Sequence, residues 1–195
     1  MPRPREFDVD TALERAMQVF WAKGYESTSL DDLCDATGLG RSSLYAAFQD
    51  KRGLYLRALG RYEENSAARI AAALARPVPI RRAIGAFLDR MVEDIAAGPG
   101  RRGCFIGNCA AEVARQDRGA AAQVRRSLER IEAAFREGLA RAKARGELAV
   151  GADVDALARF FTAGIQGLRL VGKANPDRAA LEQIAAVMLN CVHRR

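Results

Sequence analysis

Residues 29–48 contain two short helical patterns separated by a Gly-containing turn, and few folds accommodate such a pair. Ser29 stands three residues before Asp32, which is close to a capping box and predicts the start of a helix. Gly38 can take a positive φ and would end that helix. The stretch therefore predicts two helices joined by a tight turn, which is the shape of a helix-turn-helix.

The second helix of this pair would present two different faces. Leu44 and Phe48 stand four residues apart and predict a face that packs inward. In a helix-turn-helix the second helix lies in the DNA major groove. Two helices of an ordinary bundle would show the same pattern, so the pattern alone leaves both interpretations open. Under the first, the outward positions are Arg41, Ser42, Ser43 and Tyr45.

The run from Thr28 to Leu59 resembles the DNA-binding domain of the TetR family of bacterial repressors. The resemblance rests on T-S-L-D-D-L-C-D-A-T-G-L-G-R-S-S-L-Y-A-A-F-Q-D-K-R-G-L-Y, and it extends back over an expected first helix at 9–23. Gly40 departs from the Ser or Thr that the family often has there, and Gly is a weaker but acceptable helix cap. The positions that match the family's pattern are Gly38, Leu44, Tyr45, Phe48 and Lys51.

The resemblance implies an all-α protein of about nine helices in two domains. A three-helix, helix-turn-helix DNA-binding domain would occupy residues 1–50, and a linking helix residues 51–76. A helical domain for effector binding and dimerisation would occupy residues 77–195. Pro77 and Pro79 support that last boundary, because the residue before a proline is disfavoured in a helix. In this family the last two long helices pair with those of a second subunit, so we expect a homodimer.

The expected function is that of a DNA-binding transcriptional regulator, and of a repressor in particular, that a small-molecule effector releases from its operator. A twofold homodimer implies a palindromic operator in double-stranded DNA. Arginine and hydroxyl side chains can contact phosphates or base edges. The expected DNA-binding residues are Arg41, Ser42, Ser43 and Tyr45, with Thr28 and Lys51 as phosphate clamps. Residues 1–8 could add a basic arm, and a disordered tail is the alternative.

Charge agrees only in part with an anionic partner. The chain of 195 residues has a formal net charge of +7, which points to nucleic acid. Residues 1–60, however, hold eight Lys and Arg against nine Asp and Glu. The basic surplus lies in residues 61–195, so net charge does not locate the DNA site.

Other classes of protein find little support in the sequence. No apolar run approaches the roughly 18 residues of a membrane span, and the first residues lack the apolar core of a signal peptide. We therefore expect a cytoplasmic protein. The single histidine, His193, has no Cys or Ser partner in a catalytic motif, and the four cysteines form no C-x-x-C pair. We expect no enzyme activity, no metal site, no cofactor and free thiols.

The effector site is expected among the middle and later helices, because ligands of this family generally bind there. The candidates are large apolar residues and one amide on those helices. A phenylalanine at helical spacing is more often core than pocket, so packing is the alternative for each. The candidate wall residues are Phe87, Met91, Phe105, Asn108, Phe135, Phe161, Ile165 and Leu168.

A second hypothesis concerns Cys104. The segments R-G-C-F-I-G-N-C-A-A-E-V-A and G-L-R-L-V-G-K resemble one branch of the family. That branch includes regulators that sense oxidants and electrophiles through a cysteine at this place, in some cases with a lysine that would match Lys173. Arg101, Arg102 and a helix start near Cys104 would favour its thiolate. A small buried residue is the alternative.

A third hypothesis, from another class, is a helical ligand carrier or thiol enzyme without a DNA function.

Overall fold

The computed structural model describes residues 8–192, and the regular secondary structure in this range is all helical, with no strand. The expectation of an all-α chain with about nine helices is confirmed for this range. The N-terminal unit consists of α1 (Val9–Lys23), α2 (Leu30–Thr37) and α3 (Arg41–Phe48). The long α4 (Lys51–Leu74) leads out of it. Arg3, Arg5 and His193 lie outside the described residues.

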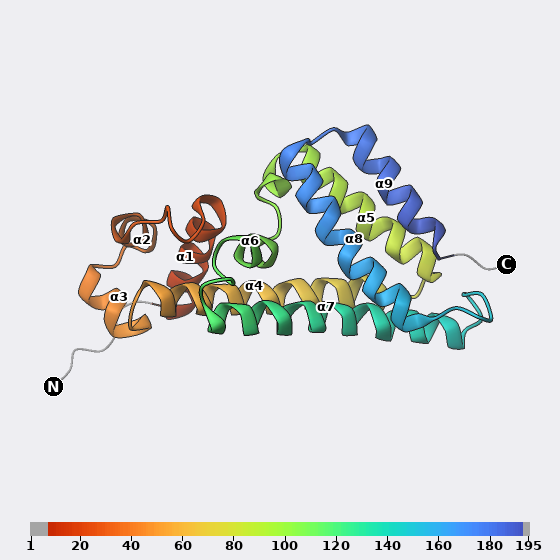
Figure 1. Cartoon of the computed structure of the whole chain (residues 1–195), viewed down its shortest axis with the longest axis horizontal. Helices are drawn as coiled ribbons and strands as arrows, with labels where there is room; N and C mark the ends of the chain where they lie inside the picture. Colours follow the sequence, from red (N-terminus) through yellow and green to blue (C-terminus); the bar gives the residue numbers. More distant parts are fainter. Residues whose placement is uncertain (1–7, 193–195) are drawn as a thin grey trace.

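The second part of the chain holds five α-helices and one short 3-10 helix, η1. They are α5 (Ile80–Ala96), η1 (Pro99–Arg102), α6 (Phe105–Glu112), α7 (Arg118–Ala144), α8 (Val154–Ala174) and α9 (Arg178–Asn190). In Figure 1, α4 and α7 run side by side along the length of the molecule, and α5, α8 and α9 pack together over one end of this pair. The helix-turn-helix unit occupies the other end.

The predicted caps explain where the first helices begin and end. The Ser29 hydroxyl accepts a hydrogen bond from the amide of Asp32 at 3.0 Å, and the Asp32 carboxylate accepts one from the amide of Ser29 at 2.9 Å. This reciprocal capping box satisfies two amides that the helix itself leaves unpaired. Gly38 takes φ 72° and ends α2 in the left-handed conformation.

α6 begins later than the sequence pattern suggests. Its first residue is Phe105, and Cys104 is its N-cap residue with extended backbone. Gly103, at φ 74°, separates α6 from η1. An L side chain is disfavoured at that φ, so a glycine at this position allows the turn between η1 and α6.

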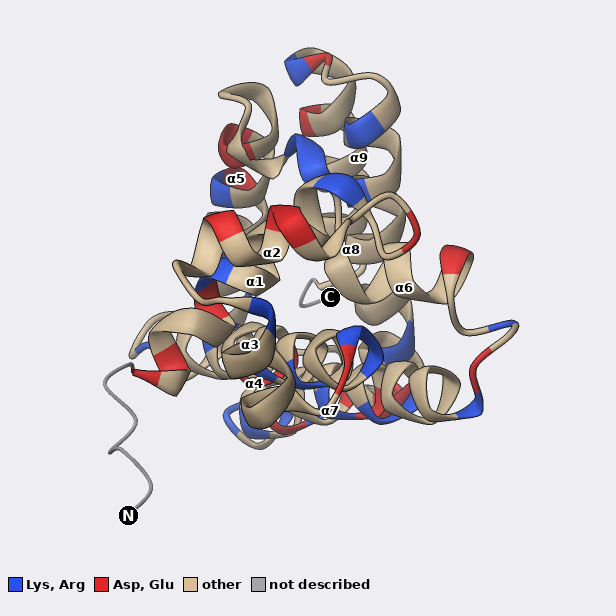
Figure 2. Cartoon of the chain, turned by 90° about the vertical axis from the view of Figure 1, so that its left-hand side faces the viewer, with Lys and Arg blue, Asp and Glu red and all other residues tan. Residues whose placement is uncertain are grey.

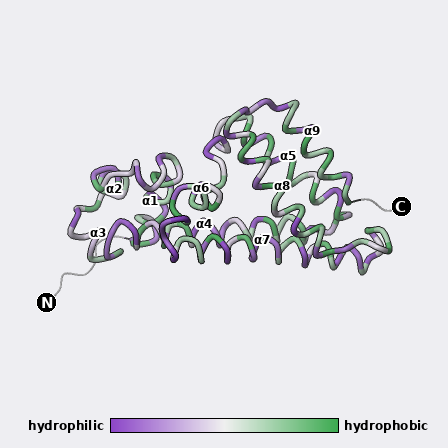
Figure 3. Tube along the Cα trace, in the orientation of Figure 1, coloured by the Kyte–Doolittle hydropathy of each residue, from purple (hydrophilic) through white to green (hydrophobic). Residues whose placement is uncertain are grey.

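α4 and α7 form the central contact of the core. In Figure 3 polar and apolar residues alternate along both helices, as expected for helices with one buried face. Gly138 of α7 faces Leu74 of α4 so closely that a Cβ atom at position 138 would lie 2.8 Å from the Cβ of Leu74. The absence of a side chain at Gly138 lets the two backbones approach.

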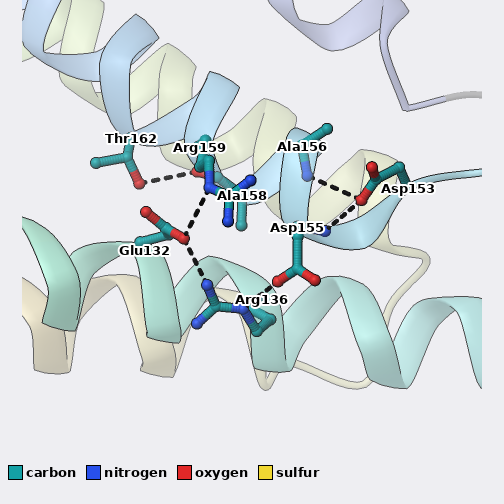
Figure 4. A network of polar contacts seen from close by, with 8 residues as sticks. All are labelled: Glu132, Arg136, Asp153, Asp155, Ala156, Ala158, Arg159 and Thr162. Carbon is teal, nitrogen blue, oxygen red and sulfur yellow. Dashed lines mark hydrogen bonds and ion pairs between the residues drawn. The ribbon is translucent and has the colours of Figure 1, made fainter.

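A chain of ion pairs joins α7 to α8 (Figure 4). Glu132 pairs with Arg136 on its own helix and with Arg159 on α8, at 2.5 and 3.5 Å. Arg136 also pairs with Asp155 at 2.5 Å. These side chains are largely exposed, so each pair contributes on the order of 0–1 kcal/mol, and their main effect is to fix the angle between the two helices.

Asp117 joins the first turns of the two long helices. As the N-cap of α7 its carboxylate accepts from the amide of Ala120 at 2.9 Å, and it also pairs through both oxygens with Arg52 in the first turn of α4. The Arg52 guanidinium, and after it the Ala120 amide, lower the pKa of Asp117 to about 2.

We expect Asp117→Asn to lower the free energy of unfolding at neutral pH, by about 1 kcal/mol or less because the pair is partly exposed to solvent. A lowered carboxyl pKa stabilises the fold above its unfolded-state value near 4, and this contribution is lost as the pH falls through the folded pKa of about 2. Urea unfolding at stepped pH values measures this. The difference between wild type and variant should disappear by about pH 2, and a difference that is independent of pH would contradict the assignment.

Candidate nucleic-acid interface and interdomain cleft

α3 has the two faces that the sequence predicts. Leu44 is 4% exposed and Phe48 is 2% exposed, so both anchor the helix in the core. Tyr45 is 42% exposed, and Arg41 and Ser42 are exposed as well, whereas Ser43 is half-buried. The buried pair fixes the orientation of α3, and the remaining side chains form an outward surface of the size that a major groove accepts.

Arg41 is held at the start of this surface by an ion pair across the turn. Its Nη2 lies 2.7 Å from Oδ1 of Asp31 on α2. Both side chains are more than half exposed, so the pair is weak and a phosphate can replace the carboxylate at little cost. Figure 2 shows both signs of charge around α2 and α3, which agrees with the near-neutral count for residues 1–60.

The turn between α3 and α4 is tight. Gln49 takes a positive φ of 71°, which is uncommon for a residue other than glycine. A Cβ atom at Gly53 would lie 2.3 Å from the carbonyl oxygen of Phe48, so only glycine allows this approach. The Asp50 carboxylate accepts from the Gly53 amide at 2.6 Å and caps α4. The close approach at Gly53 was not predicted from the sequence, although a glycine in the first turn of a helix is a usable signal.

The two expected phosphate clamps differ in the structure. Thr28 is 1% exposed, and its hydroxyl donates to the carbonyl of Gly24 at 2.5 Å. The hydroxyl of Thr28 is therefore turned inward in the chain without DNA, and a phosphate contact by this residue stays a prediction. Lys51 is half-buried in the first turn of α4, with its Nζ 4.5 Å from the centre of the Tyr25 ring. This cation–π contact positions the ammonium beside the helix start.

Several of the residues expected in the effector pocket lie in aromatic contacts or in the buried core, and their role in effector binding stays a prediction. Phe135 stacks on Phe161 at 5.5 Å between ring centres and meets the edge of Phe87 at 6.3 Å. Phe105 is 1% exposed and lies edge-on to Tyr55 and Tyr62. The spacing of the aromatic residues predicted which faces of these helices are buried. It gave no information on whether a cavity lies beside them. The others that belong to the packed core are Met91, Ile165 and Leu168.

A cleft of about 590 Å³ lies between the helix-turn-helix unit and the C-terminal helices. Three elements form its walls: the end of α1, the segment around α6, and the second half of α8. Of the expected site residues, it brings together Asn108, Cys104 and Lys173. The full lining is Trp21, Ala22, Lys23, Gly24, Gly103, Cys104, Gly107, Asn108, Ala111, Glu112, Gln166, Gly167, Leu170 and Lys173.

Cys104 forms part of the inner wall of this cleft and is 4% exposed. The hydroxyl of Tyr62 donates to its Sγ at 3.9 Å, and Arg169 donates to the oxygen of Tyr62 at 3.3 Å. Burial raises the pKa of Tyr62. The cations that the sequence placed beside Cys104 point elsewhere, since Arg102 stacks on Trp21 with 4.1 Å from its Cζ to the ring centre.

The same region ties the two domains together. The Trp21 indole N–H donates to the carbonyl of Gly103 at 3.1 Å. The Glu112 carboxylate accepts from the backbone amides of Tyr25 and Glu26 at 3.1 and 2.9 Å. Gly24 makes room for it, because a Cβ atom there would lie 2.9 Å from Glu112 Oε2. The end of α1 is therefore fixed to α6 by bonds to the main chain.

Residues 8–192 contain no group of three or more His, Cys, Asp or Glu side chains placed to hold a metal ion. In this range no helix combines the length and the apolar character that a membrane span requires.

Both halves of the chain match known protein families. Residues 12–58 match the model of bacterial regulatory proteins of the tetR family, and residues 79–188 match the tetracyclin repressor-like C-terminal domain. The first match covers the helix-turn-helix and the start of α4. The second covers α5 to α9 almost completely.

Relatives match over nearly their full length. The HTH-type transcriptional regulator YezE of Bacillus subtilis (strain 168) is 35% identical, with 97% of this chain and 98% of YezE covered. The HTH-type transcriptional repressor ComR of Escherichia coli (strain K12) is 35% identical, with 96% and 90% covered. A cysteine mutant of CifR, solved with a 26-base-pair operator, superposes with TM-score 0.84 at 32% identity, covering 96% of this chain and 98% of CifR. The chain therefore belongs to the TetR family of DNA-binding transcriptional regulators.

Proposed function

We propose that this protein is a homodimeric repressor that binds a palindromic operator in double-stranded DNA and leaves it when an effector binds. The observation that carries the proposal is the orientation of α3, which buries Leu44 and Phe48 and turns Arg41, Ser42 and Tyr45 outward. ComR is named a repressor, and CifR was solved with operator DNA, which supports the same role here. A regulator of chromosomal operators works in the cytoplasm.

The contacts divide by chemistry. Arg41 is the candidate for guanine or phosphate at the start of α3, and Ser42, Ser43 and Tyr45 are candidates for phosphates and base edges. Lys51 sits beside the free amides of the first turn of α4, where a phosphate meets both an ammonium and N–H donors. The hydroxyl of Thr28 donates to the carbonyl of Gly24 inside the N-terminal unit.

Dimerisation is proposed through α8 and α9. Large exposed apolar side chains in a soluble protein mark interaction surfaces when they gather on one face. The most exposed of them on these helices are Leu170 at 69% and Val187 at 66%, with Val171 and Phe160 at 42% and 40%. Binding to two half-sites in successive major grooves would require the twofold axis to hold the two copies of α3 about 34–36 Å apart, one helical turn of DNA.

Regulation follows if an effector binds more tightly to an arrangement in which that spacing is lost. A ligand shifts such an equilibrium only by its difference in affinity for the two states. The contacts between α1 and α6 are the joint through which the C-terminal domain would move the DNA-binding unit.

We expect Arg41→Ala to weaken operator binding by about 1–3 kcal/mol if Arg41 contacts a base. If Arg41 contacts a phosphate, the slope of log binding constant against log salt concentration should become shallower by about 1. Titration of a labelled palindrome at several salt concentrations distinguishes the two. Arg76→Ala, an exposed arginine beyond the end of α4, is the matched control and should bind like wild type. Equal affinity and equal salt dependence in both variants would remove Arg41 from the interface.

We expect Val187→Glu to dissociate the dimer, because dimerisation would bury the new charge in an interface that excludes water. Val187 is mostly exposed in the single chain, so the fold itself should tolerate the change. Sedimentation velocity would show a monomer with an unchanged far-UV spectrum and weaker operator binding. A variant that sediments as a dimer at the same concentration as wild type would place the interface elsewhere.

A thiol-based response through Cys104 is a second candidate, in which covalent change replaces ligand binding. It is favoured by the position of Cys104 in the cleft wall, with Lys173 on the same cleft and Arg169 behind Tyr62. Hypochlorite would oxidise the sulfur to sulfenic acid and be reduced to chloride, and N-ethylmaleimide would add to the thiolate. The third hypothesis, a protein without DNA function, is set aside by family membership.

If this second candidate holds, wild-type protein should lose operator binding after either reagent, whereas Cys104→Ser should keep it. Cys191→Ser is the control, since Cys191 is exposed and lies outside the cleft. Electrophoretic mobility shifts before and after treatment provide the measurement. A Cys104→Ser protein that responds like wild type would end the thiol proposal and leave the repressor proposal unaffected.

A further inference from the structure

We propose that the interdomain cleft binds a small amphipathic carboxylate, meaning a molecule with one carboxylate and one compact apolar group. The ligand would lie between the end of α1 and the second half of α8. Calling this molecule the effector rests on the function proposed above, whereas its binding to the cleft does not.

The first argument is the side-chain amide of Gln166. Its Oε1 and Nε2 are both buried and have no hydrogen-bond partner among the described residues. Gly107 lies opposite, and a Cβ atom there would be 3.4 Å from Oε1. Both residues line the cleft. A buried amide without partners costs free energy. A turn of the Gln166 side chain toward the cleft would let Nε2 donate to a ligand and form a bond that the protein alone does not make.

The second argument is the ammonium of Lys173. It stands seven residues after Gln166 on α8, so both side chains leave the same face of the helix, two turns apart. The aliphatic part of Lys173 passes over Gly103, where a Cβ atom would lie 3.2 Å from Cδ. Its Nζ donates to Oδ1 of Asn108 at 3.1 Å. An ammonium carries three donors, so the lysine is held in place with N–H groups left for an anion.

Asn108 orients the lysine. Its Nδ2 donates to the carbonyl of Arg102 at 2.9 Å while its Oδ1 accepts from Lys173. Both bonds hold the amide in place, and one N–H of Nδ2 remains beyond the bond to Arg102. The charged donor of the cleft is Lys173, and Gln166 adds an amide without a partner.

The charge around the cleft favours an anion over a cation. Arg169, one layer behind the wall, donates to Tyr62 and forms no ion pair with any described residue. The acidic wall residue Glu112 already accepts from two backbone amides. Lys23, at the rim, is neutralised by Asp32 at 2.5 Å. Lys173 and Arg169 are therefore two cations in the second half of α8 that pair with no carboxylate among the described residues.

The rest of the wall is apolar and sets the size of the ligand. Trp21 and Ala22 face it from α1, Ala111 from α6, and Leu170 from α8. Small-molecule sites in proteins commonly measure about 300–1,000 Å³, and a cleft of about 590 Å³ falls in this range. One ring or a short alkyl chain can lie against the Trp21 and Leu170 side chains while the carboxylate faces α8.

Occupancy of this cleft would act directly on the DNA-binding unit. Trp21 belongs to α1 and bonds the carbonyl of Gly103, so a ligand against Trp21 and Lys173 touches both domains at once. A ligand that favours one domain arrangement must by reciprocity be bound less tightly when operator DNA favours the other.

Trp21 also supplies the measurement, because it is the single tryptophan of the chain. We would titrate the full-length protein with benzoate, phenylacetate and hexanoate, and with the amide of each, and follow tryptophan fluorescence. At least one carboxylate should give a saturable change, and its neutral amide should bind at least about tenfold more weakly, as expected for loss of a charge-assisted hydrogen bond.

Two variants test the recognition and two matched variants control for it. Lys173→Met and Gln166→Leu remove the polar end of each side chain, leave an apolar side chain one atom shorter, and should each weaken carboxylate binding about tenfold or more. Lys143→Met and Gln116→Leu make the same changes away from the cleft and should bind the carboxylate like wild type. Far-UV spectra and thermal unfolding of all four show whether each is folded.

The proposal is overturned if none of the three carboxylates gives a saturable change, if the amides bind equally well, or if Lys173→Met and Gln166→Leu, both folded, keep wild-type affinity. Operator binding without carboxylate is measured separately. Protein that binds the operator but no carboxylate refutes only the cleft ligand, and protein that binds a carboxylate but no operator refutes only the repressor function. A carboxylate that binds without changing operator affinity refutes its role as effector.

Discussion

The packing of α4 against α7 is the interaction on which the rest of the structure depends. α4 carries the helix-turn-helix at its start, and α7 carries the C-terminal helices at its end, so the distance between the two functions is set by this pair. Gly138 against Leu74 brings the backbones close at one end, and Asp117 with Arg52 fixes the first turns at the other. A helix pair fastened at both ends can transmit a displacement along its axis more readily than it can bend.

The cleft lies where the DNA-binding unit meets α6 and α8 rather than inside the packed helical core. Phe135 and Phe161, two of the residues expected around an effector, stack on each other. The unpaired amide of Gln166 belongs to α8 and lines the cleft together with Trp21 of α1. A binding event there requires no opening of the core, and it alters contacts of the DNA-binding unit without an intermediate.

Local features of the sequence predicted local structure well. The capping box at Ser29, the end of α2 at Gly38 and the inward Leu44 and Phe48 follow from residues within a few positions of one another. The burial of Thr28 was not predicted, because it depends on how the turn after α1 brings the Thr28 hydroxyl to the carbonyl of Gly24. The cleft could not be predicted from the sequence, because its lining joins Trp21 to residues more than eighty positions away. Helical spacing carries no information on such distant pairings.

Glu112 holds the end of α1 through the main-chain amides of Tyr25 and Glu26, and the requirement it places on the other side is a glycine at position 24. This contact does not depend on which side chains α3 carries. The residues of α3 can drift to suit a new operator while the joint keeps its shape. Substitutions on α3 could therefore change the operator sequence that is bound while the contact between α1 and α6 stays the same.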